Sequence, residues 1–334
     1  MTNRKLVGIL TRVCYPKILN QRTISSLHQR HFGLISQNFV TFNSKHSFVG
    51  CTQISNYFST LTDTERAEIP DHTSTESLHF IVHRHKQPSS ECSVSEEALH
   101  TLPHPVWDTE AVENVRISHK QPEKIVDKLA YGSVKMMRFG FDVVSGYALG
   151  RIDERGWLNR IVFLETVAGV PGMVGAMVRH LKSLRHMDRD NGWIHTLLEE
   201  AENERMHLMT ILVLRRPSYL FRMGVLLTQG IFLSLFSTCY LLCHRFCHRF
   251  VAYLEEEAVV TYTKLLSEID NGHLPLFEKL PAPILAKNYW KLPDNAMFRD
   301  VILAIRADED HHRLVNHTFA QLDATGLNPF LPGQ

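Results

Sequence analysis

The sequence predicts an all-α protein, and two observations support this class. From about residue 122 onward, apolar residues recur at the three- and four-residue spacing of amphipathic helices, and the alternation typical of strands is absent. Helix stops divide this part of the chain, among them Gly192, Pro217 and the turn at Gly272. We therefore expect six helices, over residues 123–148, 156–185, 193–214, 218–245, 247–270 and 295–322.

The first 62 residues differ from the rest of the chain in charge. They carry seven Lys or Arg residues and no Asp or Glu, although the 334-residue chain sums to only +1. A basic, acid-free, Ser- and Thr-rich leader is typical of a mitochondrial or plastid transit peptide, and a basic tail without targeting function is the alternative. We expect a transit peptide at 1–62, a polar linker or N-terminal arm at 63–107 and a helical domain at 108–334. The remainder is acidic, which argues against a nucleic-acid-binding protein.

Two helical stretches are apolar enough to raise the question of membrane contact. Residues 223–243 contain no formal charge and are long enough to span a bilayer, but Thr and Ser residues dilute their hydropathy. Residues 161–178 contain Glu165, which would be costly inside hydrocarbon. A helix that lies in the membrane interface, or that packs against a partner subunit, is equally compatible with both patterns.

The pattern Glu-x-x-His places a carboxylate and an imidazole on one face of a helix. Chance predicts about one such pair in this composition, yet the chain contains four, which begin at Glu76, Glu97, Glu204 and Glu309. The first two lie in the polar linker, and we assign them to chance. The last two, Glu204-x-x-His207 and Glu309-x-x-His312, lie within expected helices.

A bundle that holds two metal ions also needs one Glu from each of two further helices. Glu165 lies in an apolar helix, where a carboxylate has to be paired or to bind a metal. The other comes from residues 255–257, where helical phase puts Glu255 on the apolar stripe and leaves Glu257 as the weaker alternative. Carboxylates with at most two imidazoles favour iron or manganese over zinc. The pattern leaves open whether His207 and His312 bind metal directly or support the ligands.

These motifs resemble the four signature motifs of the alternative oxidases, the cyanide-insensitive ubiquinol oxidases of mitochondria. The segments that carry the resemblance are Leu164-Glu165-Thr166, Asn203-Glu204-Arg205-Met206-His207-Leu208, Leu254-Glu255-Glu256-Glu257-Ala258 and Arg306-Ala307-Asp308-Glu309-Asp310-His311-His312. The resemblance extends over roughly residues 105–330, and the protist type is the most similar. It implies a ferritin-like four-helix bundle with a di-iron carboxylate site, and two further long helices, 123–148 and 218–245, that form a membrane-facing surface.

The resemblance also implies a function and an assembly. The enzyme would oxidise ubiquinol and reduce dioxygen to water without pumping protons, bypassing the cytochrome chain. It would be a homodimer bound monotopically to inner-membrane lipid on the matrix face of the mitochondrial inner membrane, with 108–334 as the oxidase domain.

Individual residues follow from the same resemblance. The two iron ions would be held by Glu165, Glu204, Glu255, Glu309, His207 and His312, with Tyr262 as the catalytic tyrosine. The ubiquinol pocket would be formed by Arg138, Asp142, Arg160, Leu164, Ala258 and Thr261. A supporting hydrogen-bond network would contain Asn203, Asp308, His248, Tyr289 and Trp290. The spacing of Arg138 and Asp142 allows them to pair on one helix face, whereas Arg160 is expected to be a lone cation that needs an acceptor such as a quinol oxygen.

Four other functions stay open at this point. A di-iron quinone hydroxylase would lack the Leu-Glu-Thr and Asn-Glu-Arg-Met-His contexts, and a ferritin-like iron store would lack apolar interfacial helices. A membrane structural protein with chance motifs would bind no iron. A plastid plastoquinol oxidase would differ mainly in compartment.

Overall fold

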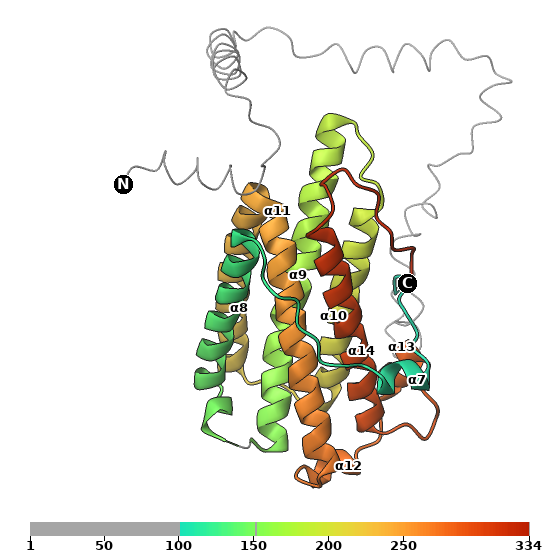
Figure 1. Ribbon diagram of the computed structural model, residues 1–334. Coiled ribbons are helices and arrows are strands. Elements are labelled where there is room, and N and C mark those ends of the chain that lie inside the picture. The colour runs from blue at the N-terminus through green and yellow to red at the C-terminus, as the bar shows by residue number, and fades with distance from the viewer. Residues whose placement is uncertain (1–100, 151, 334) are drawn as a thin grey trace, which may run out of the picture. The chain divides into compact units, whose positions relative to one another are not determined.

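The computed structural model describes residues 101–150 and 152–333. The expected transit peptide, residues 63–100 of the arm and the Glu-x-x-His pairs at Glu76 and Glu97 lie outside the described residues. Within the described part the chain is helical, and extended pairing is limited to one isolated bridge between Pro281 and Met297 (Figure 1). The all-α prediction is therefore confirmed.

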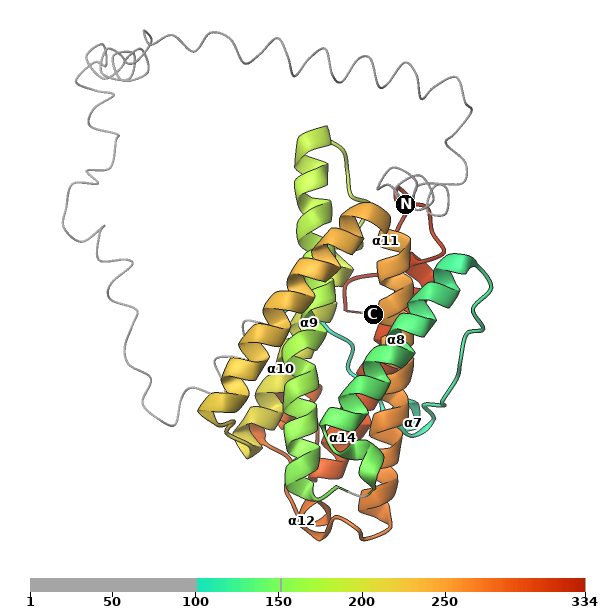
Figure 2. The ribbon, with the colours of Figure 1, turned by 90° about the vertical axis from the view of Figure 1, so that its left-hand side faces the viewer.

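Four helical segments form the bundle: α9 (Glu154–His186), α10 (Trp193–Leu214), the second half of α11 (Tyr219–Asp270) and α14 (Phe298–Phe319) (Figure 1). Helix α9 packs against α10 and α11, and α14 packs against α11. Helix α8 (Ile125–Val144) lies along α11 outside this bundle, as Figure 2 shows. The short elements are α7 (Thr109–Glu113), η2 (Tyr147–Leu149), α12 (Pro275–Glu278) and α13 (Ile284–Trp290).

The helices begin where local chemistry favours a start. The Asp153 carboxylate accepts a hydrogen bond from the backbone N–H of Gly156 at 2.8 Å and caps α9. The Ser218 hydroxyl caps α11 in the same way, through the backbone N–H of Phe221 at 3.3 Å. Gly192 precedes α10 with a φ of 91°, a conformation that glycine adopts without strain. These caps explain why the expected helices agree with the observed ones to within a few residues.

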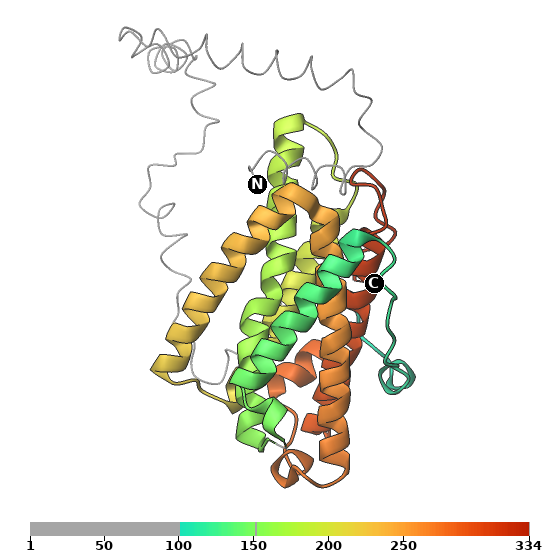
Figure 3. The same ribbon diagram turned by 60° about the vertical axis from the view of Figure 1, so that its left-hand side comes forward.

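Helix α11 consists of two helical halves that meet at a kink. The sequence predicts separate helices over 218–245 and 247–270, and the observed break lies nearby at Cys243, where φ is −157° and ψ is 83°. Neither proline nor glycine lies at this position, so the usual sequence signals of a kink are missing. The kink turns the two halves away from each other, so that the second half joins the bundle while the first diverges from it (Figure 3).

Close approach of α9 and α10 brings their glutamates together. A side chain at Gly172 would put its Cβ 2.6 Å from the backbone oxygen of Leu197, so only glycine allows this separation of the helices. Below this contact, an apolar core of large buried side chains closes one end of the bundle, with Trp157, Leu265 and Ile302 almost fully buried. Burial of such side chains stabilises the helices by about 1.5–3 kcal/mol each.

Two helices are long and apolar enough to cross a membrane by length and composition, namely α9 and α11. The apolar window of α9 is 44% buried within the protein, whereas that of α11 is only 11% buried. The first half of α11 exposes leucines such as Leu220, Leu227 and Leu241, and α8 exposes Met136 and Phe139. These helices therefore carry a large apolar surface that the described residues do not cover.

Candidate metal centre

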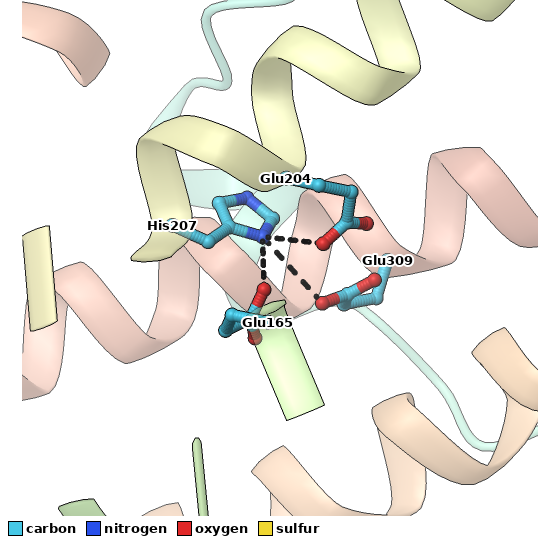
Figure 4. A group of neighbouring side chains, drawn as sticks. All are labelled: Glu165, Glu204, His207 and Glu309. Atoms are coloured by element: carbon cyan, nitrogen blue, oxygen red, sulfur yellow. Dashed lines mark ion pairs between the residues drawn. The ribbon is translucent and has the colours of Figure 1, made fainter. Parts of the chain in front are cut away.

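Four glutamates and two histidines meet inside the bundle, one set from each of its four helices. Helix α9 contributes Glu165, α10 contributes Glu204 and His207, α11 contributes Glu255, and α14 contributes Glu309 and His312. The ligand atoms of Glu165, Glu204, His207 and Glu309 lie within 4.8 Å of one another (Figure 4). The same holds for Glu204, Glu255, Glu309 and His312. Glu204 and Glu309 belong to both groups, so they lie between the two.

The distances show that both imidazoles face the carboxylates through Nδ1. His207 Nδ1 lies 3.5 Å from Glu165 Oε2, 3.5 Å from Glu204 Oε2 and 3.6 Å from Glu309 Oε1. His312 Nδ1 lies 2.9 Å from Glu204 Oε1 and 3.6 Å from Glu309 Oε2. Each of these five side chains is at most 5% exposed. The arrangement is therefore a buried, acidic pocket into which Nδ1 of each histidine points.

Several polar atoms in this pocket form no hydrogen bond of good geometry with any of the described residues. They are Glu165 Oε2, both carboxylate oxygens of Glu204, Glu309 Oε2, His207 Nδ1 and His312 Nδ1. Buried polar atoms almost always have partners, so a convergent set without them needs another explanation. Cations between the two groups would satisfy these atoms together, and carboxylate oxygens with imidazole nitrogens suit iron or manganese. The residues therefore fit a pair of metal ions, and Glu204 and Glu309 would be available to both.

Protonation of the pocket reflects the crowding of its negative charges. Burial and the charge of Glu204 raise the pKa of Glu165 to about 7. Burial and neighbouring carboxylates also raise the pKa of Glu255 and Glu309. Burial opposes charge on His312, but its contact with Glu204 raises the pKa of the imidazole to about 9. Without metal, the pocket holds protons that bound cations would replace.

Helical phase separates the three consecutive glutamates of α11. Glu255 lies in the metal pocket, whereas Glu256 turns away from it towards the arm and α14. Its carboxylate contacts His119 Nδ1 at 2.6 Å and His317 Nε2 at 2.8 Å. Glu257 points towards α8. The structure thus brings Glu255, and not Glu257, together with the other expected metal ligands.

Asp308 is the centre of a buried hydrogen-bond network behind His207. Its Oδ2 accepts hydrogen bonds from His207 Nε2 at 3.0 Å, Asn203 Nδ2 at 3.0 Å and Trp290 Nε1 at 2.8 Å, and its Oδ1 accepts from Trp107 Nε1 at 2.6 Å. Burial opposes ionisation, but the His207 contact holds the pKa of Asp308 below its usual value. Because Nε2 contacts Asp308, Nδ1 is the nitrogen of His207 that faces the metal pocket.

The N-terminal arm contributes to this network, which the sequence did not indicate. Trp107 reaches Asp308, and the His104 ring stacks on Tyr289 with centroids 3.7 Å apart. The Tyr289 hydroxyl in turn accepts from Asn203 Nδ2 at 3.0 Å. An extended segment has no periodicity that reveals its contacts, so Trp107 is a residue of the candidate site that the sequence does not predict.

His248 belongs to a different chain of hydrogen bonds. Its Nε2 lies 3.0 Å from the Tyr240 hydroxyl and its Nδ1 lies 2.9 Å from Asn316 Oδ1. Asn316 Nδ2 donates to Glu200 Oε2 at 2.8 Å, and burial raises the pKa of Glu200 to about 7. The structure therefore keeps His248 apart from the Asp308 network, although the resemblance puts both in one group.

The expected ubiquinol-pocket residues meet where α8, α9 and α11 adjoin. Arg138 Nε donates to Asp142 Oδ2 at 2.9 Å, as the spacing predicts, and Arg138 NH1 donates to Glu257 Oε2 at 3.1 Å. The expectation that Arg160 is a lone cation is wrong, because it pairs with Asp142 and donates to the Ser145 hydroxyl at 2.7 Å. The tertiary fold supplies these acceptors from α8 and the residue that follows it. Glu257 also belongs to this cluster, although the sequence predicts it only as the weaker alternative metal ligand.

Tyr262 contacts the metal pocket from α11. Its hydroxyl donates a hydrogen bond to Glu165 Oε1, and burial with the charge of Glu165 raises the pKa of the phenol. The preceding residue, Thr261, donates through Oγ1 to the backbone oxygen of Glu257 at 2.7 Å, and Leu164 and Ala258 are half-buried. The expected catalytic tyrosine therefore contacts a metal-pocket carboxylate and follows an expected quinol residue in sequence.

Comparison with known proteins agrees with this arrangement. The model of a family described as alternative oxidase matches residues 107–321. The mitochondrial alternative oxidase of Emericella nidulans is 51% identical over 239 residues, which cover 68% of this chain and 68% of that protein. The mitochondrial alternative oxidase of Trypanosoma brucei brucei is 51% identical over 231 residues, which cover 68% of this chain and 70% of the relative. Alternative oxidase 2 of Candida albicans is 47% identical over 244 residues, 68% of this chain and 67% of its own.

Proposed function

Because the chain belongs to the alternative oxidase family and is a ubiquinol oxidase, we propose that it reduces dioxygen to water at two iron ions held in the pocket of α9, α10, α11 and α14. The observation that carries this proposal is the convergence of buried carboxylate oxygens and imidazole nitrogens that lack hydrogen-bond partners. The ligands would be Glu165, Glu204, Glu255 and Glu309, with His207 and His312 facing the same space. Iron, when bound, supplies the redox chemistry with dioxygen that no side chain can provide.

The side chains around the pocket orient it and hold its protons. Asp308 and Trp107 fix His207 so that Nδ1 faces inward. The Tyr262 hydroxyl keeps its proton and donates a hydrogen bond to Glu165, and this contact supports a catalytic role for Tyr262 between quinol and metal. These hydrogen bonds already hold His207 and Tyr262 in place, which favours a preorganised site.

The charged cluster beyond Tyr262 supports a ubiquinol pocket. Arg138, Asp142 and Arg160 present paired charges that can hydrogen-bond the two quinol oxygens, while Leu164 and Ala258 offer apolar surface to the ring. Helix α8 carries Arg138 and Asp142, and Phe163, which precedes Leu164, packs against Phe141 of α8 and Phe221 of α11. A quinol dissolved in lipid would reach the pocket from the apolar faces of α8 and the first half of α11 without crossing water.

We assign the exposed apolar face of α8 and the first half of α11 to membrane binding. On α8 it includes Leu129, Met136 and Phe139, and on α11 Leu227 and Leu235, each more than half exposed. The relatives are named as mitochondrial proteins. A monotopic position on the matrix face of the inner membrane, with residues 1–62 as the transit peptide, agrees with these features.

A second exposed apolar stripe supports the homodimer. Met173, Met177, Leu181 and Leu184 lie on α9 at intervals of three or four residues and are about half exposed or more. A second copy of the chain is the proposed occupant of this stripe.

We also propose that the oxidase domain begins at His104 rather than at residue 108, because His104 and Trp107 contact residues of α13 and α14.

The proposed function is tested by oxygen uptake in membranes that contain the protein. With ubiquinol as donor and cyanide present, the wild type is expected to consume oxygen. Glu204→Ala should abolish uptake and metal binding, whereas Glu202→Ala, two residues away and paired with surface Arg205, should preserve both. Metal-loaded wild type that consumes no oxygen with ubiquinol would contradict the proposal, and so would an active Glu204→Ala.

A further inference from the structure

A small cavity lies between α10 and α14, beside the metal pocket. Its volume is about 20 Å³, and one ordered water needs about 10–15 Å³. The lining residues of the inner end are buried, and those of the outer end are half-buried parts of the arm and α14. The ten lining residues are His104, Pro105, Thr196, Glu199, Glu200, Asn203, Asp308, His311, His312 and Val315.

Asn203 brings an acceptor without a partner to this cavity. Its side-chain nitrogen donates to Asp308 Oδ2 and to the Tyr289 hydroxyl, both at 3.0 Å. An ionised carboxylate can only accept, so the amide cannot be turned round. Asn203 Oδ1 is buried and has no hydrogen-bond partner within the described residues, although the residue is only 4% exposed. A buried acceptor of this kind requires a donor that the described side chains do not supply.

Glu200 offers a second polar group in the same wall. Asn316 fixes one of its oxygens at 2.8 Å, and Asn316 is itself held by His248. The carboxylate therefore keeps its position beside the cavity. A water molecule between Asn203 and Glu200 would have two acceptors within its lining, which is the environment that buried waters require.

We propose that this cavity holds an ordered water and forms the path by which product water leaves the metal pocket for solvent between α10 and α14. His312 belongs both to the metal pocket and to the cavity lining, so the two spaces adjoin. None of the expected quinol residues lines the cavity. Ubiquinol and water would thus use different routes.

The exit path rests on the proposed function, whereas the water site does not. Two ubiquinols supply four electrons and four protons to one dioxygen, which gives two ubiquinones and two waters. Both waters have to leave the metal pocket while the apolar quinol ring occupies the cluster of Arg138, Asp142 and Arg160. A separate polar opening would let water leave without displacing the quinol.

The experiment compares two matched substitutions on α14. Val315 lines the cavity and is 1% exposed, whereas Val301 is fully buried in the apolar core and does not line it. Val315→Ile and Val301→Ile each add one methylene. Structures of the metal-free wild type at a resolution that shows waters should contain density within hydrogen-bond distance of Asn203 Oδ1. Val315→Ile should lose that density and lower kcat at least threefold with an unchanged ubiquinol KM, and Val301→Ile should do neither.

Two results would overturn the proposal. An empty cavity in the wild type would remove the water site, and Val315→Ile that loses the water but keeps the wild-type kcat would remove the exit path. If Val315→Ile does not fold, Thr196→Ile narrows the cavity from the α10 wall and takes its place. Failure of the wild type to oxidise ubiquinol would contradict the proposed function instead, while the water density in metal-free protein still decides the site.

Discussion

Replacing each of the three consecutive glutamates of α11 by glutamine is expected to give three different defects. Glu255→Gln removes one of the four carboxylates of the metal pocket. Substitution of a residue that only supports a metal ligand already weakens metal binding by about 10- to 100-fold. We expect a loss at the upper end of this range, so that purified Glu255→Gln holds less than the wild-type amount of iron and has no oxidase activity.

The two neighbouring substitutions should leave the iron in place. Glu256 accepts hydrogen bonds from His119, His317 and the backbone N–H of Lys120 at 2.6–3.0 Å. Glutamine keeps one acceptor oxygen, so we expect a loss of about 2 kcal/mol of unfolding free energy. For Glu257→Gln, Arg138 keeps its bond to the Glu257 backbone oxygen at 3.0 Å. The lost ion pair of about 1 kcal/mol corresponds to roughly a fivefold rise in ubiquinol KM.

Three assays on each variant separate these outcomes. Metal analysis reports the iron per chain, denaturant unfolding reports stability, and oxygen uptake at varied ubiquinol gives kcat and KM. If Glu257→Gln loses iron while Glu255→Gln keeps it, the helical phase that assigns the ligands is wrong. Equal defects in all three variants would also refute the reasoning, because the side chains would then share one environment.

The structure makes four further predictions. Asp308→Ala leaves the buried donors on His207, Trp290 and Trp107 without an acceptor, so denaturant unfolding should show a loss of more than about 3 kcal/mol; a loss below 1 kcal/mol would contradict the network. Tyr262→Phe should retain iron but lose oxygen uptake, and full uptake would remove its catalytic role. Burial raises the pKa of Glu165 to about 7, so the folded metal-free protein keeps a proton that the unfolded chain releases near pH 4.5. The unfolding free energy should therefore fall as the pH rises from 4.5 to 7. Glu165→Gln should flatten this pH dependence. Leu227→Asp, on the exposed face of α11, should release the protein from vesicles in a flotation assay, whereas Leu314→Asp on α14 should not; equal binding would contradict the membrane surface.

The parts of the fold that sequence predicts well are those with local causes. Glu204 and His207 share a helix face because they are three residues apart, and Glu255 was selected from its neighbours by its phase against the apolar stripe. Helix caps at Asp153 and Ser218 are local signals too. Such features depend on one helix alone, so the sequence predicts which of their residues face the metal pocket.

The parts that sequence did not reveal depend on distant contacts. Trp107 and Asp308 are 201 residues apart, and the arm that carries Trp107 has no periodicity. The partner of Arg160 comes from α8, so its helix alone suggests an unpaired cation. The break in α11 is predicted, but its exact place at Cys243 is not, since neither proline nor glycine lies there. In each case tertiary packing decides the outcome, and a single sequence does not contain that information in a local form.

The central claim is that a pair of iron ions held by the carboxylates and histidines of the bundle carries out ubiquinol oxidation. The most direct test adds ferrous iron to metal-free protein in steps, without oxygen, and then measures cyanide-resistant, ubiquinol-dependent oxygen uptake at each step. We predict that uptake rises with bound iron and reaches its plateau at two ions per chain. Uptake by the metal-free protein, or two bound ions without uptake, would contradict the claim.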